Sequence, residues 1–310
     1  MYQPLKNSSS EFITIRDQRY HVRTWGSRES LKHNKPLVLL HGWMDVAASF
    51  QFMVDALKID RFIIAPDWRG FGLTKSIDSR TRPVDHYLFA DYLGDLDLLL
   101  DHYFQDEPIE LVGHSMGGNI SMIYSGVRPQ RIHKLINLEG FGMASTTPSQ
   151  AANRYAKWMD EIKELHKGNI NLKPYKSLAD VAQRLIKNNP RISPDKAEWL
   201  AAHWAQEDVD GTWHILGEAA HKVSSVHLYR ADETSEIHKC ISAPILCVTA
   251  QEDSLQKWWG KSYKIEEFYE RMKVVKDIRY HELANTGHML HHDQPMALAQ
   301  LIENFLQNNL

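Results

Sequence analysis

The fold of this chain is decided by one stretch, Ile109-Glu110-Leu111-Val112-Gly113-His114-Ser115-Met116-Gly117-Gly118-Asn119. Its first four residues form a short apolar run, and an apolar-periodic segment over 120–127 follows the glycines. This pattern predicts a buried strand, a sharp turn and a helix. The central residue of such a turn is strained, so the residues two before and two after it must be small. Both are glycine here. An ordinary glycine-rich turn would also contain Gly-x-Ser-x-Gly, but the strand before and the helix after favour a nucleophile elbow at Ser115.

The composition is that of an ordinary globular protein. The chain has 310 residues, of which 43% are hydrophobic and 24% are charged, which allows one large α/β domain with an insertion. A net charge of -3 without a basic stripe argues against nucleic acid as a partner. No apolar run approaches the roughly 20 residues that span a bilayer, and the first residues lack the apolar region of a signal peptide. We therefore expect a cytoplasmic protein that does not bind membranes. Cys240 and Cys247 are expected to be reduced thiols.

Strand and helix patterns alternate along most of the chain. Alternating residues predict an antiparallel hairpin at a sheet edge, over 11–16 and 20–25. Continuous apolar runs predict further buried strands over 36–40, 62–65, 134–140, 244–249 and 277–283. Helices are expected near 49–57, 85–104, 258–272 and 295–306. Together with the strand before Ser115, this order predicts a doubly wound, mostly parallel, eight-stranded sheet.

The alternation stops between 143 and 229. That region contains helical stretches over 151–166, 177–187 and 193–205, separated by prolines. We expect a helical cap, or lid, over 143–229, inserted into a core domain made of 1–142 and 230–310. Four tryptophans fall in the insertion: Trp158, Trp199, Trp204 and Trp213. Most are expected to form the small core of the cap, although some could line an apolar acyl pocket.

A serine needs a base to become a nucleophile, and the base needs an acid to orient it. The candidate base is His288, which follows the last predicted strand and so should lie at the carboxyl edge of the sheet near Ser115. The alternative is an exposed loop histidine. His291, His292 and Asp293 could be imagined as metal ligands, but a solvated helix start with Asp293 near the N-cap explains them better. We therefore expect no metal.

Two carboxylates compete for the role of acid. Asp253 follows the strand that ends at Thr249, and it completes the chain order Ser, Asp, His, so we take it as the candidate. Glu139 ends the strand after the elbow and also borders the predicted site.

Acyl transfer also needs two donors for the developing oxyanion. We expect these to be the backbone N–H groups of Met116 and Trp43, because the elbow positions the first and His41-Gly42 leads into the second. The Trp43 and His114 side chains are candidate substrate contacts. His41 is expected to be a hydrogen-bonded structural residue.

Asp67 and Arg69 are not expected to be catalytic. We expect them to brace a loop, with a carboxylate accepting backbone N–H groups beside an internal ion pair.

With these residues in place, the chain resembles the α/β-hydrolase superfamily, in the branch with a helical cap. The resemblance runs from about Arg19 to the C-terminus. It rests on H-G-W at 41–43, D-W-R-G-F-G at 67–72, G-H-S-M-G-G at 113–118, the Asp253 loop and G-H-M-L-H at 287–291. That branch includes carboxylesterases, epoxide hydrolases, haloalkane dehalogenases and serine-hydrolase-like proteins. Epoxide hydrolases and dehalogenases of this type carry aspartate as nucleophile, so Ser115 argues against both.

The resemblance implies a serine hydrolase without a cofactor, acting on carboxylic esters of small to medium apolar substrates. Its partner would be a small-molecule ester, and the protein would be a monomer or homodimer. The same triad can cleave carbon–carbon bonds in vinylogous ketones or act as a perhydrolase, and both alternatives stay open. A ligand-binding protein without activity is a further alternative, although such proteins commonly lose a triad member.

Overall fold

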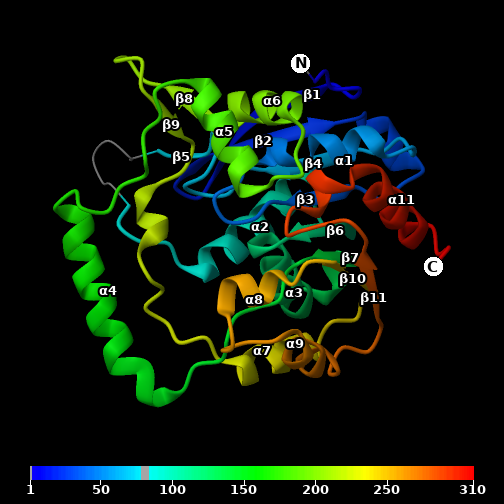
Figure 1. The fold of residues 1–310 in the computed structure, drawn as a ribbon. Coiled ribbons are helices and arrows are strands. Elements are labelled where there is room, and N and C mark those ends of the chain that lie inside the picture. Colours follow the sequence, from blue (N-terminus) through cyan, green and yellow to red (C-terminus); the bar gives the residue numbers. More distant parts are fainter. Residues whose placement is uncertain (1, 78–83) are drawn as a thin grey trace.

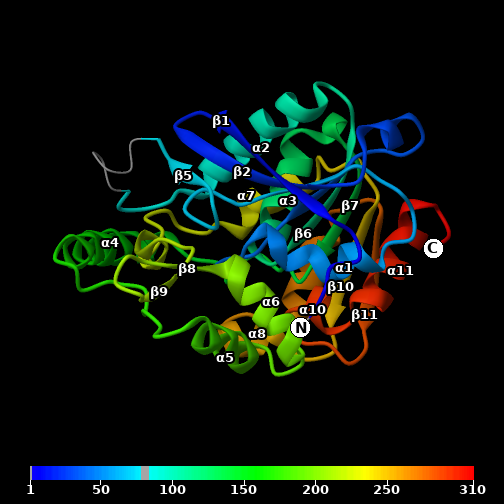
Figure 2. The same cartoon turned by 90° about the horizontal axis from the view of Figure 1, so that it is seen from above.

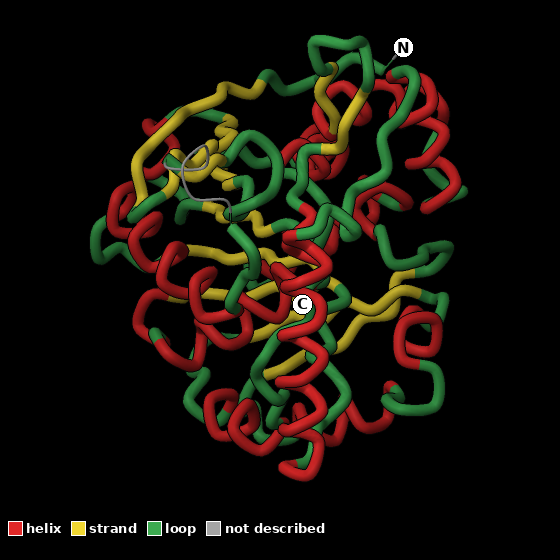
Figure 3. Tube along the Cα trace, turned by 90° about the vertical axis from the view of Figure 1, so that its left-hand side faces the viewer, coloured by secondary structure: helices red, strands yellow, loops and turns green. Residues whose placement is uncertain are grey.

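The computed structural model describes residues 2–77 and 84–310. Met1 and residues 78–83, which belong to the predicted core range 1–142, lie outside the described residues. The molecule is built on one twisted sheet with helices on both faces, as Figures 1 and 3 show. The sheet contains β1 (Ser8–Ile15), β2 (Gln18–Trp25), β3 (Leu37–Leu40), β4 (Ile63–Pro66), β5 (Lys75–Ser76), β6 (Ile109–His114), β7 (Ile132–Leu138), β10 (Ile245–Ala250) and β11 (Ile278–Leu283).

The strand order is β1-β2-β4-β3-β6-β7-β10-β11, with the two-residue β5 paired to β2. All neighbours from β4 to β11 are parallel, whereas β1 and β2 form an antiparallel hairpin and β2 is antiparallel to β4. The predicted eight-stranded, mostly parallel sheet is therefore confirmed. Only β5 was not expected, because two residues are too short to show a period.

Helices cover the two faces of the sheet. The described residues form these α-helices, some of which lie on the sheet and others in the segment 143–229: α1 (Gln51–Ala56), α2 (Phe89–Phe104), α3 (Met116–Val127), α4 (Ala151–His166), α5 (Leu178–Asn188), α6 (Pro194–Trp204), α7 (Ala231–His238), α8 (Ser254–Trp259), α9 (Ile265–Met272), α10 (Leu290–Asp293) and α11 (Pro295–Leu306). One buried apolar cluster joins the sheet to α2, α3 and α9, and a second joins its other face to α1 and α11. This is the doubly wound arrangement that the alternating sequence predicts.

Some boundaries differ from those expected. The helix expected over 258–272 is two helices, α8 and α9, because α8 ends at Gly260, whose φ is 55°. A glycine adopts this left-handed region without the steric cost that other residues meet, so it ends the helix. α2 begins at Phe89 rather than at 85.

The segment 143–229 contains α4, α5 and α6, as expected, and also a small antiparallel pair, β8 (Ala205–Glu207) and β9 (Trp213–Ile215), which was not. In Figures 1 and 2, α4 lies at one side, away from the sheet. A third apolar cluster joins α5 and α6 to Val46 and Ala48, which lie between β3 and α1, and to Phe52 in α1. Trp204 belongs to this cluster, and Trp199 and Trp213 pack against it. These three tryptophans are therefore packing residues, as expected for most of the four.

Asp67 and Arg69 form the predicted brace. The Asp67 carboxylate accepts the backbone N–H groups of Ala47 at 2.7 Å and Leu73 at 2.9 Å. Burial alone would raise the pKa of this carboxyl, but the hydrogen bond and charge of His21 lower it overall. Arg69 pairs with Asp95 through two hydrogen bonds, of 2.6 and 2.8 Å. The hydrogen bonds of Asp67 and the ion pair of Arg69 thus fix the loop after β4.

Cys240 and Cys247 are both free thiols, as expected. Among the described residues, no helix is both long enough and apolar enough to cross a bilayer.

Candidate active site

Ser115 lies in the turn between β6 and α3, with φ 52° and ψ −115°. A Cβ atom added at Gly113 would lie 2.3 Å from the carbonyl oxygen of Gly117. One added at Gly117 would lie 2.1 Å from the carbonyl oxygen of Leu40 on β3. Neither position can hold a side chain without moving backbone, which confirms the predicted need for small residues. The turn presents Ser115 at the N-terminus of α3.

His288 follows β11, and its Nε2 atom lies 3.0 Å from Ser115 Oγ. Several hydrogen bonds hold its loop, among them the following. His114 Nε2 donates to the His288 carbonyl at 2.7 Å, the Gly287 N–H donates to Asp293 at 2.8 Å, and Thr286 Oγ1 donates to the Leu283 carbonyl at 2.5 Å. The structure therefore brings together the predicted nucleophile and the predicted base.

The carboxylate beside His288 is that of Glu139. This residue follows β7 with φ 57°, and its Oε2 atom lies 3.3 Å from His288 Nδ1. Glu139 is buried, yet its carboxylate is well supplied with donors. The Ala250 N–H donates to Oε1 at 2.7 Å, and the Ser254 hydroxyl donates to Oε2. These bonds fix the carboxylate in the orientation that faces the imidazole.

The prediction that Asp253 orients His288 is wrong for this structure. Asp253 is exposed and caps α8, where its Oδ1 atom accepts the Gln256 N–H at 2.8 Å. A helix start leaves N–H groups without partners, and an aspartate is a preferred residue to satisfy one of them. This capping bond turns the Asp253 carboxylate away, while the next residue, Ser254, is buried and points to Glu139.

The H-G-W turn packs directly against the nucleophile. A Cβ atom at Gly42 would lie 3.1 Å from Ser115 Cβ. His41 Nδ1 donates to the Gly42 carbonyl at 2.8 Å, and its Nε2 accepts the Trp68 N–H at 2.9 Å. His41 is therefore a neutral structural residue, as expected, and burial lowers its pKa. Because the peptide after Gly42 is trans, the Trp43 N–H points away from the carbonyl that His41 holds.

The aromatic rim of the site contains one residue that sequence reasoning missed. The Trp43 side chain is 45% exposed, which leaves it free to meet a substrate. Trp258 on α8 is 60% exposed, and its ring centroid lies 5.8 Å from that of His288. The aromatic-rich stretch that begins at Trp258, where a helix was expected over 258–272, was the available signal.

His114 cannot be the substrate contact that was predicted. It is 1% exposed, and its ring lies 4.8 Å from that of His288 and 4.6 Å from that of His291. Burial holds the pKa of His114 well below its usual range, and the nearby His288 adds to this effect. The neutral, buried ring of His114 supports the loop that carries His288 through its hydrogen bond to the His288 carbonyl.

The solvated helix start predicted for His291 and His292 is also wrong. Both side chains are buried, because the short helix α10 packs under the elbow against the chain around Phe50. Asp293 does not cap a helix. It accepts the Gly287 N–H and the Asn189 side-chain amide at 2.7 Å.

Comparison with known proteins shows to which family the chain is similar. The family model of the alpha/beta hydrolase fold matches residues 35–295. A serine hydrolase-like protein of Danio rerio is 24% identical over 310 residues, covering 98% of this chain and 90% of that protein. Serine hydrolase-like protein 2 of Homo sapiens is 23% identical, covering 92% of this chain and 90% of its own.

Among solved structures, the thioesterase domain from the curacin biosynthetic pathway superposes with a TM-score of 0.80 at 21% identity, covering 96% of this chain and 99% of that one. This likeness concerns the fold. The family model covers most of the chain, including the elbow and the His288 loop, and the relatives carry serine hydrolase names. The chain therefore belongs to the alpha/beta hydrolase fold family.

Proposed function

We propose that the protein is a serine hydrolase that cleaves carboxylic esters of small to medium apolar substrates through an acyl-enzyme on Ser115. The observation that carries the proposal is the hydrogen-bonded chain from Ser115 Oγ through the His288 ring to Glu139, with heavy-atom distances of 3.0 and 3.3 Å. A serine hydroxyl within reach of an imidazole that a carboxylate orients is the arrangement that activates oxygen for attack on a carbonyl.

In the proposed mechanism, Ser115 Oγ attacks the ester carbonyl while His288 Nε2 takes its proton. Glu139 accepts a hydrogen bond from the Nδ1–H group and stabilises the imidazolium that forms. The backbone N–H groups of Met116 and Trp43 would bind the oxyanion, because the first opens α3 and the second lies on the turn that packs on Ser115. His288 then gives its proton to the leaving alcohol and activates water, which releases the acid.

The proposed role of the 143–229 segment is that of a cap over this site. Support comes from the Trp204 indole N–H, which donates to the Met44 carbonyl at 3.1 Å, directly after the H-G-W turn. The segment thus touches the loop that would bind the oxyanion. Exposed Trp43 and Trp258 offer apolar surface at the site, which favours apolar acyl or alcohol groups.

A panel of p-nitrophenyl esters with acyl chains of increasing length tests the proposal, with a vinylogous diketone measured in parallel. We expect turnover of the esters and covalent labelling of Ser115 by a fluorophosphonate, since both need only an activated serine. Cleavage of the diketone without turnover of any ester would favour carbon–carbon bond hydrolysis instead. Absence of both turnover and labelling would contradict an enzymatic function.

Esters of tertiary alcohols are expected to be poor substrates. The turn after β3 reads His-Gly-Trp-Met rather than a run of glycines, and Gly42 already packs on Ser115 Cβ. Space beside the scissile carbonyl should therefore be limited. The measurement compares kcat/KM for ethyl acetate and tert-butyl acetate, with the p-nitrophenyl ester as a control for active enzyme. Comparable values for the two acetates would reject this expectation.

A further inference from the structure

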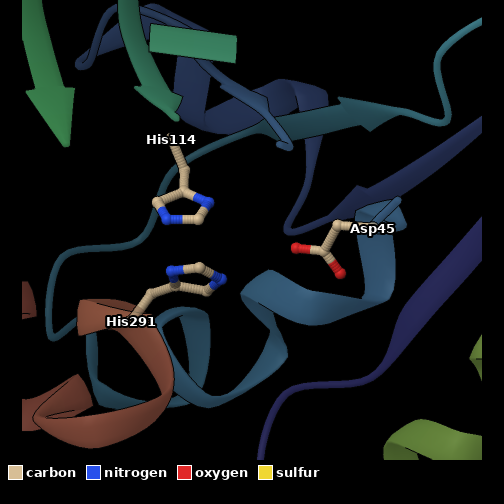
Figure 4. A group of neighbouring side chains, drawn as sticks. All are labelled: Asp45, His114 and His291. Atoms are coloured by element: carbon tan, nitrogen blue, oxygen red, sulfur yellow. The ribbon is translucent and has the colours of Figure 1, made fainter. Parts of the chain in front are cut away.

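Three buried side chains from distant parts of the chain meet beside the nucleophile elbow, as Figure 4 shows. Asp45 lies in the loop after β3, His114 ends β6 immediately before Ser115, and His291 lies in α10. Their ligand atoms all lie within 4.8 Å of one another. The side chains are 7%, 1% and 0% exposed, so bulk water does not reach this cluster.

Each of the three residues presents a polar atom that has no partner among the described residues. These atoms are Asp45 Oδ2, His114 Nδ1 and His291 Nδ1. Buried polar atoms are nearly always paired, and each exception asks for an explanation such as an unseen ion or water. Because the three residues face one another, a single occupant could satisfy all three atoms at once.

The hydrogen bonds of the two Nε2 atoms bear on whether each Nδ1 atom, which faces the cluster, carries a proton or a lone pair. His114 Nε2 lies 2.7 Å from the His288 carbonyl, which can only accept, so Nε2 carries the proton. In the neutral ring, Nδ1 then presents a lone pair to the cluster. His291 Nε2 lies 3.2 Å from the Ser49 hydroxyl, which also lies 2.6 Å from His292 Nε2. When this hydroxyl accepts the hydrogen bond from His291 Nε2–H, Nδ1 of His291 presents a lone pair to the cluster as well. Histidines that bind metals almost always donate their other N–H to such an acceptor.

We propose that Asp45, His114 and His291 form a site for one divalent transition-metal ion of the zinc type. Two imidazole nitrogens and one carboxylate oxygen form a donor set that suits zinc. Calcium and magnesium prefer sites made of oxygen alone. The carboxylate offsets one of the two positive charges of the ion. This role is distinct from the proposed hydrolase chemistry, because none of the three side chains hydrogen-bonds to the Ser115 hydroxyl or to the ring of His288, whose partners are Ser115 and Glu139.

The position of His114 gives the site a defined consequence. An ion bound to Nδ1 would fix the ring whose Nε2 holds the backbone of His288. The ion would thus act as a positioning element for the loop of the base, and its loss would loosen that loop without removing any group from the triad.

The test measures metal binding directly on the chelator-treated full chain. Zinc retained after equilibrium dialysis gives the stoichiometry, and cobalt absorption reports four- or five-coordinate geometry, which scattered surface histidines do not produce. We expect one zinc per chain in the wild type. In Asp45→Asn and in His291→Gln the affinity should fall by more than the about 10–100-fold that loss of an outer partner costs. His238→Gln, which removes a buried histidine on α7, is the matched control and should bind as the wild type does.

Circular dichroism shows whether each variant is folded. If Asp45→Asn does not fold, His291→Gln alone decides the matter, together with the zinc-dependent rise in Tm that only the wild type and His238→Gln should show. Absence of stoichiometric zinc in the wild type would overturn the proposal and would indicate a buried water or a shared proton. Equal zinc binding and an equal cobalt spectrum in the folded ligand variants would overturn it as well.

Discussion

Ser115→Ala is expected to leave a folded protein whose kcat for p-nitrophenyl esters falls by about 10⁶-fold, as it does when a serine triad loses its nucleophile. The hydroxyl forms the covalent bond, and no other group in the elbow can replace it. Ser115 is the N-cap of α3, but its side chain makes no capping hydrogen bond, so its removal costs the helix little. Initial rates at saturating ester, with labelling by a fluorophosphonate, give the measurement.

His288→Ala and the double variant are the controls for this prediction. Nucleophile and base act as one unit, so the double variant should be no slower than either single variant. Circular dichroism and Tm must match the wild type before rates are compared. Activity of Ser115→Ala within tenfold of the wild type would remove Ser115 from the mechanism.

Glu139→Gln is expected to lower kcat by about 10⁴-fold, whereas the matched control Asp253→Asn should retain most of the wild-type rate. The amide keeps the shape of the carboxylate but loses the charge that stabilises the imidazolium, and it can favour the wrong tautomer of His288. Asp253 lies on the surface as a helix cap, so its amide variant changes only an exposed capping bond. Asparagine is itself a good N-cap, which makes this control mild.

The two variants must be compared at equal folded fraction, because the Ala250 N–H and the Ser254 hydroxyl both donate to Glu139. Ser254→Ala removes one of these donors and should lower kcat far less than Glu139→Gln does. An inactive Asp253→Asn beside an active Glu139→Gln would show that the acid comes from the loop after β10, and that the arrangement described above is not the active one.

The parts of the site that the sequence predicts well are those that local chemistry determines. Gly113 and Gly117 are required by the turn itself, because a Cβ at either would meet backbone. His288 is placed by its position after the last strand, which carries it to the carboxyl edge of the sheet. In both cases the residue types in one short stretch are enough to specify the geometry.

The choice between Asp253 and Glu139 depends on the rotation of a loop by a single residue. Asp253 and Ser254 are neighbours after β10, and whichever turns inward decides which carboxylate faces His288. The start of α8 settles this, since the first residue of the pair caps the helix. The sequence pattern predicts that both acids lie near the same edge of the sheet, but it does not predict the direction in which either side chain points.

The other wrong or missed predictions have two causes, which are tertiary burial of a polar segment and strands too short to show a pattern. The run His291-His292-Asp293 has the polarity of a surface helix start, yet α10 lies under the elbow and hides both rings. Similarly, β8 and β9 have three residues each, which is too few for a period to appear.

Exchange of the 143–229 segment between relatives would transplant only part of a folding unit. Val46, Ala48 and Phe52 lie outside that segment but share one apolar cluster with α5 and α6. A chimera joined at 143 and 229 would set foreign side chains against these three native ones, and poor fit in a packed cluster is destabilising. The unit that would have to be exchanged as a whole is therefore the 143–229 segment together with residues 46–52. Since 46–52 continues directly from the turn beside Ser115, sequence changes in the 143–229 segment and in that turn are expected to be coupled in evolution.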